Sequence, residues 1–430
     1  MNVSDSERVA SSLVAEGYEL TQEESEADII LLNTCSVREK AEHKLYTRVG
    51  QVREREDRPM LGVMGCVAQL EGENLFAHGR GIDFVIGTRA VGRLGDAISR
   101  VGQGEDRVID LGEREEDYDW SVSDRQRHSP YVSFIPIIEG CNKFCTYCIV
   151  PFSRGREKSL PASEIIRQVR RLMEEGVSEI HLIGQNVNSY RPSSAEGLEG
   201  VAGATPFSRL LRAVAQTGIE RIKFATSFPR DFHPDIVDAI DEHENLCNWV
   251  HLPVQSGSNV VLRGMRRGHT VESYMRRIDR VRESHRDITL TTDIIVGFPG
   301  ETEEDFQDTI RLAEYCKFDS GYIFRYSPRP GTPAYELEDD VTFEEKTRRF
   351  QELERVIRRT QRESQEKIIG KTLKVLAERV SAKSDDVLTG HSTCHRVVNF
   401  PAGRHLLGKV IEVEVTESKV NSLFGHAKGI

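Results

Sequence analysis

The chain divides into three regions by the pattern of its apolar and polar positions. In the first region, to about residue 118, helical stretches alternate with short apolar runs. The expected strands are Ile29–Leu32, Met60–Met64 and Phe84–Ile86, and the expected helices are Asp5–Glu16, Val37–Arg53 and Ala90–Val101. Short apolar runs between helices are typical of buried parallel strands. The pattern therefore predicts a small parallel α/β domain.

In the central region, from about residue 131 to about residue 327, strand-like and helix-like segments alternate six times. The expected strands are Ser133–Ile137, Glu179–Ile183, Arg221–Ala225, Trp249–Val254, Thr289–Val296 and Gly321–Tyr326. The expected helices are Ala162–Glu175, Phe207–Gln216, Pro234–Glu242, Val271–His285 and Thr302–Cys316. Six units predict a partial parallel (βα)6 barrel, in which the chemistry takes place at the C-terminal ends of the strands. The acidic stretch Gly102–Arg127 before the barrel is expected to be a linker.

The last region has no helical period. It follows a charged helix, expected at about Thr342–Ile369, and contains short alternating runs at Leu373–Ala377, Arg396–Phe400 and Lys409–Val415. These runs predict a small β-barrel of the oligonucleotide-binding (OB-like) type, with a purely stabilising domain as the alternative. The whole chain is thus an α/β protein with expected domains at 1–118, 127–365 and 366–430.

Glycine and polar residues follow each expected strand of the central region. These loops are Glu139–Cys141, Gly184–Asn186, Thr226–Pro229, Gln255–Ser258, Gly297–Thr302 and Ser327–Thr332. One or two such loops are ordinary turn chemistry. Six on one edge of a barrel predict a mouth lined for a cofactor.

Composition and charge narrow the function classes. The net charge is −11 over 430 residues, which is unfavourable for binding RNA, so any RNA contact requires local basic surfaces. Arginine and lysine gather at Arg263–Arg286 and Lys346–Lys371, where a solvated helix face is the alternative reading. No apolar run approaches the ~20 residues of a membrane span. We therefore expect a monomeric cytosolic protein without a membrane partner.

Three cysteines, Cys141, Cys145 and Cys148, carry the strongest chemical signal. Their spacing is the one used by enzymes that hold a [4Fe-4S] cluster with one open iron and cleave S-adenosylmethionine to make a radical. A structural zinc site is the alternative, but no second Cys-x-x-Cys pair or His-x3-5-His follows. A disulfide framework fits less well, because the chain is long and no signal peptide is recognisable.

The other five cysteines lie outside this motif. Cys35 and Cys66 each end an apolar run, and ligands gather at the strand ends of open α/β sheets, so the two thiols are candidates for one site. Taken singly, each is more simply a free buried cysteine. We expect Cys247 and Cys316 to be buried on barrel helices and Cys394 to be buried in the β region.

The motifs at Asn33–Glu42, Gly65–Gln69 and Cys141–Cys148, together with the strand-end loops, resemble the radical methylthiotransferase family over the whole chain. Within that family, the chain is most similar to the branch acting on N6-dimethylallyladenosine at position 37 of tRNA. The branches acting on threonylcarbamoyladenosine or on a ribosomal protein remain alternatives. A non-catalytic RNA-binding protein that holds a metal is a third alternative.

The resemblance implies an N-terminal methylthiotransferase domain, a radical S-adenosylmethionine barrel and a TRAM-like C-terminal β-barrel that contacts RNA. It also implies two [4Fe-4S] clusters, the first on Cys141, Cys145 and Cys148 and the second on three N-terminal cysteines. Two of those three match Cys35 and Cys66, and the third is absent, because the sequence begins inside the corresponding family motif. We therefore expect that the start is misplaced or truncated, with one strand missing, and that sulfur insertion by the chain as written is poor.

The resemblance also supplies candidate residues and partners. S-adenosylmethionine is expected on Gly184, Gln185, Ser227, Gln255 and Asp293. RNA phosphates are expected on Arg263, Arg266, Arg267, Arg396 and Lys409. The expected partners are tRNA, through adenosine 37 of its anticodon loop, and an electron donor such as flavodoxin or ferredoxin.

Overall fold

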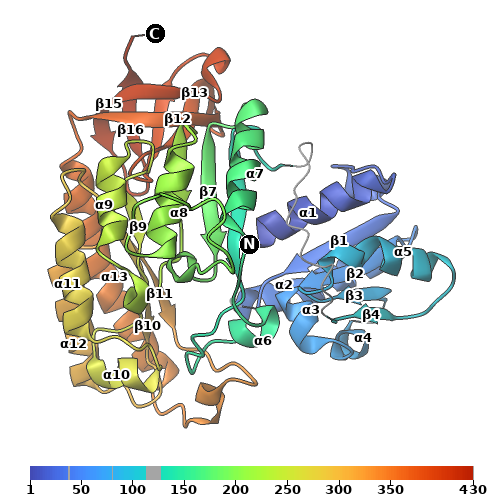
Figure 1. Cartoon of the computed structure of the whole chain (residues 1–430). Coiled ribbons are helices and arrows are strands. Elements are labelled where there is room, and N and C mark those ends of the chain that lie inside the picture. Colours follow the sequence, from blue (N-terminus) through green and yellow to red (C-terminus); the bar gives the residue numbers. More distant parts are fainter. Residues whose placement is uncertain (37–38, 80, 113–126, 430) are drawn as a thin grey trace. The chain divides into compact units, whose positions relative to one another are not determined.

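The computed structural model describes residues 1–36, 39–79, 81–112 and 127–429 (Figure 1). Contacts divide the chain into two compact units. Around the three-cysteine motif, successive segments of the chain belong alternately to one unit and to the other. The first comprises Met1–His128, Glu139–Asn142 and Cys148–Glu157. The second comprises Ser129–Ile138, Lys143–Tyr147 and Lys158–Ile430. None of the described helices is long and apolar enough to cross a membrane.

The first unit is built on a parallel sheet in the order β1-β2-β3-β4. Its strands are β1 (Ile29–Thr34), β2 (Met60–Gly65), β3 (Phe84–Ile86) and β4 (Val108–Asp110). The main helices are α1 (Asn2–Ala15), α2 (Glu39–Arg53), α3 (Cys66–Glu71), α4 (Asn74–His78), α5 (Leu94–Gly102) and α6 (Val150–Arg154). This confirms the predicted parallel α/β layer.

Both faces of this sheet are buried, which explains the continuous apolar runs. Phe84 and Ile86 pack with Leu94 of α5 on one face, while Val85 packs with Val49 of α2 on the other. Successive side chains of a strand point to opposite faces, so a strand covered on both sides needs apolar residues throughout.

The linker prediction is wrong at Val108–Asp110, which forms strand β4 beside β3. A strand of this length carries too few apolar residues to stand out from a charged stretch. Residues 113–126 of the same expected linker lie outside the described residues, as do Val37 and Arg38 of the expected second helix.

The second unit contains the predicted partial barrel. One sheet has the order β6-β5-β7-β8 and the other the order β11-β10-β9, and a parallel bridge from Ile222 to Leu246 connects them. The strands are β5 (Val132–Glu139), β6 (Lys158–Ser159), β7 (Glu179–Gly184), β8 (Arg221–Phe224), β9 (Trp249–His251), β10 (Thr289–Val296) and β11 (Ser320–Arg325). The six predicted strands are therefore confirmed, and the short edge strand β6 is an addition.

Helices lie along the outer side of these strands (Figure 1). They are α7 (Ala162–Glu174), α8 (Pro206–Ala215), α9 (Asp235–Glu242), α11 (Val271–Arg282) and α12 (Glu303–Cys316), with the short α10 (Asn259–Gly264) at a strand end. Thr205, Thr270 and Thr302 cap α8, α11 and α12 with reciprocal capping boxes. The long α13 (Phe343–Glu366) packs against β11 and leads to the last domain.

The C-terminal region is a closed barrel in the order β12-β13-β14-β16-β15. Its strands are β12 (Thr372–Ser381), β13 (Ser384–Ser392), β14 (Val397–Pro401), β15 (Val410–Ser418) and β16 (Leu423–Ala427). Val375, Leu388 and Val413 belong to its apolar core. The predicted small β-barrel is confirmed, with two more strands than the three apolar runs indicated. It contacts the parallel barrel, since the hydroxyl of Ser178 donates to the carbonyl of Gly408 at 2.8 Å.

Candidate active site

The candidate cofactor residues lie on four neighbouring strands or in the loops that follow them, with Asp293 within β10. Gly184 ends β7, and Gln185 follows it. The next loops are tied to one another by backbone hydrogen bonds: Val187 donates to Thr226 after β8, and Ser227 donates to His251 in β9. Gln255 then donates to Asp293 in β10 at 2.9 Å. The structure therefore brings the five residues to one continuous rim.

Two buried polar atoms on this rim have no hydrogen-bond partner among the described residues. They are the hydroxyl oxygen of Ser227, a residue that is 1% exposed, and the amide oxygen of Gln185. An unpaired buried polar group costs free energy, and native proteins seldom leave one without a reason. The rim thus has hydrogen-bonding capacity left for a polar ligand such as S-adenosylmethionine.

The backbone of the rim is strained in two places. Thr226 has φ 67° and Gln255 has φ 76°, although neither is glycine. Left-handed backbone costs a residue with a side chain free energy, and it is found most often at functional sites. At Gly184 the requirement is space, because a Cβ there would lie 2.6 Å from the carbonyl oxygen of Ile138.

The Asp293 carboxylate is the acidic group of the rim. Its Oδ2 lies 3.5 Å from Nε2 of His251, and its side chain keeps 27% exposure. Nδ1 of His251 lies 3.0 Å from the Thr291 hydroxyl, which holds the ring in place. Asp293 is therefore available to accept hydrogen bonds from hydroxyl or amino groups of a ligand.

The middle of the three-cysteine motif, Lys143–Tyr147, is anchored in the second unit. Nζ of Lys143 lies 2.7 Å from Oδ2 of Asp231 in a buried ion pair. Thr146 donates from its backbone to Met265 at 3.1 Å and from its hydroxyl to Gly264 at 2.8 Å. Burial raises the pKa of the Asp231 carboxyl, but hydrogen bonds from Lys143, Ser189 and Arg230 outweigh it and hold this pKa below its usual value.

Cys145 is buried beside an arginine. Nη1 of Arg267 lies 3.5 Å from the Cys145 Sγ, and Nη2 donates to the carbonyl of Pro253 at 2.8 Å. The guanidinium also stands 4.5 Å from the ring centroid of Phe228. A fixed positive charge at this place stabilises negative charge on the sulfur.

The two ends of the motif belong to the first unit. Cys141 donates from its backbone to Gly155 at 3.0 Å. Gly140 has φ 79°, and a Cβ there would lie 2.1 Å from the carbonyl oxygen of Arg156, so only glycine fits. Among the described residues, no three His, Cys, Asp or Glu side chains converge on one metal-ion position. A four-iron cluster does not require such convergence, because its cysteines bind different irons.

Arg154 lies just after this motif and is buried in the first unit. It pairs with Asp5 at 2.5 Å and with Glu139 at 3.0 Å. Burial opposes its charge, but Asp5, Cys66 and Glu139 together raise the Arg154 pKa. Arg154 therefore serves the packing of α6 and α1.

Cys35 and Cys66 come together at one edge of the N-terminal sheet. Cys35 follows the last residue of β1, and Cys66 follows the last residue of β2. Those last residues, Thr34 and Gly65, are paired in the register. Gly65 has φ 94°, and a Cβ there would lie 2.6 Å from Oδ1 of Asn33. The remaining cysteines are buried as expected, although Cys247 precedes β9 and does not lie on a helix.

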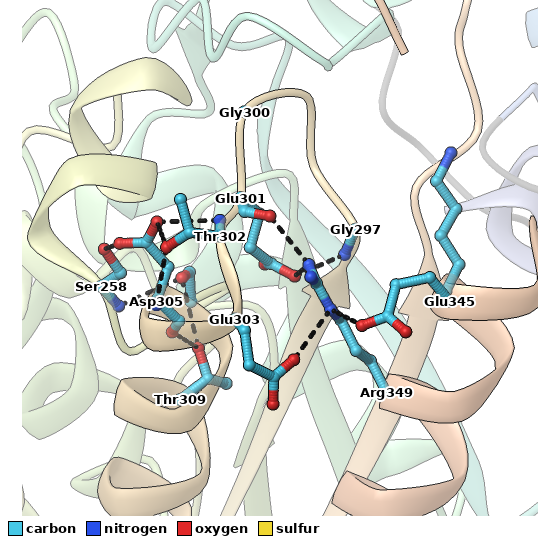
Figure 2. A network of polar contacts seen from close by, with 12 residues as sticks. Ser258, Gly297, Gly300, Glu301, Thr302, Glu303, Asp305, Thr309, Glu345 and Arg349 are labelled. Carbon is cyan, nitrogen blue, oxygen red and sulfur yellow. Dashed lines mark hydrogen bonds and ion pairs between the residues drawn. The ribbon is translucent and has the colours of Figure 1, made fainter. Parts of the chain in front are cut away.

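The loop after β10, Gly297–Thr302, is held by a buried ion pair that is shown in Figure 2. The Glu301 carboxylate accepts from the backbone of Gly297 and from Nη1 of Arg349, both at 2.8 Å. Burial raises the Glu301 pKa, with Gly297 and Arg349 opposing the shift. Helix α12 begins directly after this loop, and its Asp305 accepts a hydrogen bond from the Ser258 hydroxyl, so the loops after β9 and β10 are fixed together (Figure 2).

The candidate phosphate contacts divide into exposed and buried residues. Arg263, Arg266 and Lys409 are exposed. Arg267 is buried against Cys145, and Nη2 of Arg396 lies 2.7 Å from Oδ1 of Asp319 in a buried pair. Both arginines are thus engaged inside the protein, and their expected role in binding phosphates stays a prediction.

Sequence reasoning missed Asp231 and Arg349, the partners of Lys143 and Glu301. Each pair joins residues far apart in the chain, since the residue numbers differ by 88 in the first pair and by 48 in the second. The sequence signal for these partners was a charged residue inside each loop, Lys143 in the cysteine-rich loop and Glu301 in the glycine-rich loop. A charged side chain that becomes buried needs a partner of opposite charge.

Three family models match the chain. The Radical SAM superfamily model matches residues 135–313, the model described as uncharacterized protein family UPF0004 matches residues 1–87, and the TRAM domain model matches residues 366–428. A solved radical S-adenosylmethionine methyltransferase, TsrM from Kitasatospora setae, shares the fold. Its TM-score is 0.59 at 16% identity, over 77% of this chain and 73% of that one.

Full-length relatives are more similar in sequence. A protein of Koribacter versatilis (strain Ellin345), named tRNA-2-methylthio-N(6)-dimethylallyladenosine synthase, is 40% identical over 100% of this chain and 96% of its own. A protein of the same name from Solibacter usitatus (strain Ellin6076) is 41% identical over the same shares. Superfamily membership implies S-adenosylmethionine and a [4Fe-4S] cluster. The chain belongs to the radical S-adenosylmethionine methylthiotransferase family.

Proposed function

We propose that this protein adds a methylthio group to carbon 2 of N6-dimethylallyladenosine at position 37 of tRNA. The observation that carries the proposal is the identity of about 40% with relatives named for this activity, over the whole chain. The sequence identity extends over all three regions that the family models match. The chain therefore has the catalytic barrel and both flanking domains in common with these relatives.

We assign the radical cluster to Cys141, Cys145 and Cys148. The donor set fits, because it offers three thiols within eight residues on a loop that both units hold by specific hydrogen bonds. When bound, the cluster and S-adenosylmethionine supply a carbon-centred radical that removes the hydrogen from carbon 2 of the adenine. The protein residues position the groups: Lys143 and Asp231 hold the loop, and Arg267 places a positive charge beside Cys145.

The rim residues are suited to hold S-adenosylmethionine. Ser227 and Gln185 offer the unpaired polar atoms, and Asp293 offers a carboxylate. Gly184 and Gln255 shape the backbone between them.

Sulfur insertion is proposed to use a second cluster on Cys35 and Cys66. Their support is the shared position at the end of the paired strands β1 and β2. Two thiols on adjacent strand ends provide part of a cluster site.

RNA binding is assigned to the C-terminal barrel and to the exposed Arg263, Arg266 and Lys409. Because the net charge is −11, these cations have to act locally, and affinity is expected to fall with salt. A tRNA substrate also fits a cytosolic location and an electron donor such as flavodoxin or ferredoxin. We expect the enzyme to act as a monomer.

The proposal is tested by nucleoside mass spectrometry of tRNA from a strain that lacks the endogenous enzyme. Complementation with the full-length gene is expected to restore 2-methylthio-N6-dimethylallyladenosine. The Cys145→Ala variant is expected to abolish this product and S-adenosylmethionine cleavage, whereas the control Cys394→Ala, in the C-terminal barrel, retains both. If cleavage is normal but the modified nucleoside never forms, the substrate assignment is wrong.

A further inference from the structure

A cavity of about 500 Å³ lies in the second unit, beside the beginnings of strands β9, β10 and β11, and it is also lined by His251, whose ring contacts Asp293 of the cofactor rim. Trp249, Thr289 and Ser320 line it from the first residues of β9, β10 and β11. Gln361 of α13 forms a side, and His395 and Asn421 of the C-terminal barrel close it. Its volume lies within the range of roughly 300–1,000 Å³ that is usual for small-ligand sites.

The cavity has an aromatic wall. The ring of His395 stacks on Trp249 with centroids 4.0 Å apart, and His391 stacks on the other side at 5.2 Å. His395 has φ 60°, a strained conformation for a residue with a side chain. The imidazole lies nearly parallel to the Trp249 ring and forms part of the lining.

The lining contains one pair of oppositely charged side chains. Arg396 and Asp319, which both line the cavity, pair with each other at 2.7 Å. Burial lowers the His395 pKa to about 2, with Lys223, His391 and His181 adding to the shift, so its ring is neutral. Such a lining suits an uncharged ligand and disfavours a phosphate group.

Hydrogen-bonding capacity remains unused in this lining. Among the described residues, the buried Nδ1 of His395 and Nε of Arg396 have no hydrogen-bond partner. The carboxamides of Gln361 and Asn421 also face the cavity. A flat polar heterocycle with a hydroxylated ribose matches this combination of donors, acceptors and ring surfaces.

The entrance favours a nucleoside that remains part of an RNA chain. Tyr322, on the rim of the cavity, is 64% exposed on β11, the edge strand of its sheet. Exposed aromatic rings are the usual stacking platforms for unpaired bases. The C-terminal barrel, which closes the cavity, matches the TRAM model and is the domain assigned to RNA.

The cavity is within reach of the active site along the strands. Thr289 lines the cavity and Asp293 lies on the cofactor rim, and the two residues point to the same face of β10 because they are four apart. At a rise of ~3.3 Å per residue, their Cα atoms are separated by roughly 13 Å.

We propose that this cavity binds the base and ribose of one unpaired nucleotide of the substrate RNA, near to but distinct from the adenosine that is modified. The inference rests on the proposed function, because it takes the RNA substrate from there. The phosphates remain outside at the mouth, and Tyr322 stacks on the base or on its neighbour. The second base would fix the register of the loop while the first enters the barrel.

The test measures binding of the full-length, cluster-loaded protein to a fluorescent anticodon stem-loop carrying N6-dimethylallyladenosine. Tyr322→Ala and Gln361→Ala remove groups at the cavity. Their matched controls are Tyr315→Ala, an exposed tyrosine on α12, and Gln351→Ala, on an exposed face of α13. We expect each cavity variant to weaken binding about tenfold, as loss of one base stack does, while each control leaves Kd within twofold.

Abasic substitution along the RNA loop identifies the nucleotide. Removal of one base other than adenosine 37 is expected to weaken binding to the wild-type protein about tenfold and to have no further effect on Tyr322→Ala. If the wild-type protein binds and modifies the RNA but the cavity variants match their controls, the cavity assignment is overturned. The cavity assignment is also overturned if free nucleosides bind in the cavity but no abasic substitution in the RNA loop weakens binding to the wild-type protein. Failure of the wild-type protein to modify the RNA would instead refute the proposed function.

Discussion

The guanidinium Nη1 of Arg267 lies 3.5 Å from the Sγ of Cys145, although 122 positions separate the two residues in sequence. Both side chains are buried, and Phe228 covers the guanidinium. The arginine is held in place by the Pro253 carbonyl, so its charge remains beside the sulfur. A cysteine that binds an iron cluster carries negative charge, and this arrangement stabilises that charge.

Replacing Arg267 by Met is expected to make the cluster harder to reduce. Reduction adds an electron, and without the guanidinium the added charge has less compensation, so the midpoint potential falls by on the order of tens of millivolts. A redox titration followed by electron paramagnetic resonance measures this shift. The exposed Arg263 serves as the control, since Arg263→Met leaves the potential unchanged. An unaltered potential in Arg267→Met would show that the arginine has only a packing role.

The ion pair between Lys143 and Asp231 is expected to determine how well the cysteine loop keeps its cluster. Asp231→Asn leaves the ammonium of Lys143, whose side chain is 8% exposed, without its carboxylate. The loop is then less firmly held, so cluster loss on exposure to air becomes several times faster. Bleaching of the visible absorbance gives the rate. Asp308→Asn, on the outer face of α12, is the control, and equal rates for the two variants would contradict the prediction.

Adjacent arginines of α13 provide a matched test of the loop after β10. The Arg349 side chain is 6% exposed and pairs with the buried Glu301, whereas that of Arg348 is 44% exposed and forms surface pairs. Arg349→Met leaves a buried carboxylate unpaired, so it is expected to lower the free energy of unfolding by about 3–5 kcal/mol. Arg348→Met is expected to cost about 0–1 kcal/mol.

Urea unfolding of both α13 variants under anaerobic conditions measures these differences. The double variant Glu301→Gln with Arg349→Met is expected to recover part of the loss, because it removes the uncompensated charge. Equal destabilisation by the two single variants would mean that the buried pair contributes no more than a surface pair.

His395 is expected to make stability depend on pH in a defined window. Burial lowers its pKa from 6.5 to about 2, with Lys223 the next cause. The unfolded chain therefore binds a proton below pH 6.5 that the folded chain does not bind, so stability falls as pH decreases from 6.5, by about 1.4 kcal/mol per pH unit for this group. His395→Asn keeps a residue that tolerates φ 60° and removes the titrating group.

Calorimetric melting of wild-type and His395→Asn proteins between pH 7.5 and 5.5 tests this slope. The variant is expected to lose less stability than the wild type over that range. Parallel curves for the two proteins would assign the pH dependence to other groups.

The fold was largely predictable because its signal is local. Apolar runs buried on both faces, such as Phe84–Ile86, identify a parallel strand without reference to the rest of the chain. The three-residue strand β4 and the two-residue strand β6 were missed, because segments of that length are defined by their neighbours. The domain bounds remain predictions.

The candidate site was predictable only in part. The cysteines and the rim residues lie in compact motifs, whereas the burial of Arg267 and Arg396 depends on contacts with Cys145 and Asp319 far away in sequence. A basic residue near a strand end has the same appearance in sequence whether it contacts solvent or a buried sulfur. The distinction is made by tertiary packing, which a single sequence does not display.

The C-terminal barrel contacts residues at the beginnings of the parallel-barrel strands, so it also has a structural role in that barrel. Ser178 bonds to Gly408, Arg396 pairs with Asp319, and His395 stacks on Trp249, so this domain forms the floor of the catalytic barrel. Glu179 and Lys223, both about 1% exposed inside that barrel, lie close enough to His395 of this domain to influence its pKa. A variant that lacks the last domain is therefore expected to admit water to the parallel barrel at the N-terminal ends of its strands. The C-terminal barrel and the parallel barrel belong to the same compact unit, so we expect them to unfold together.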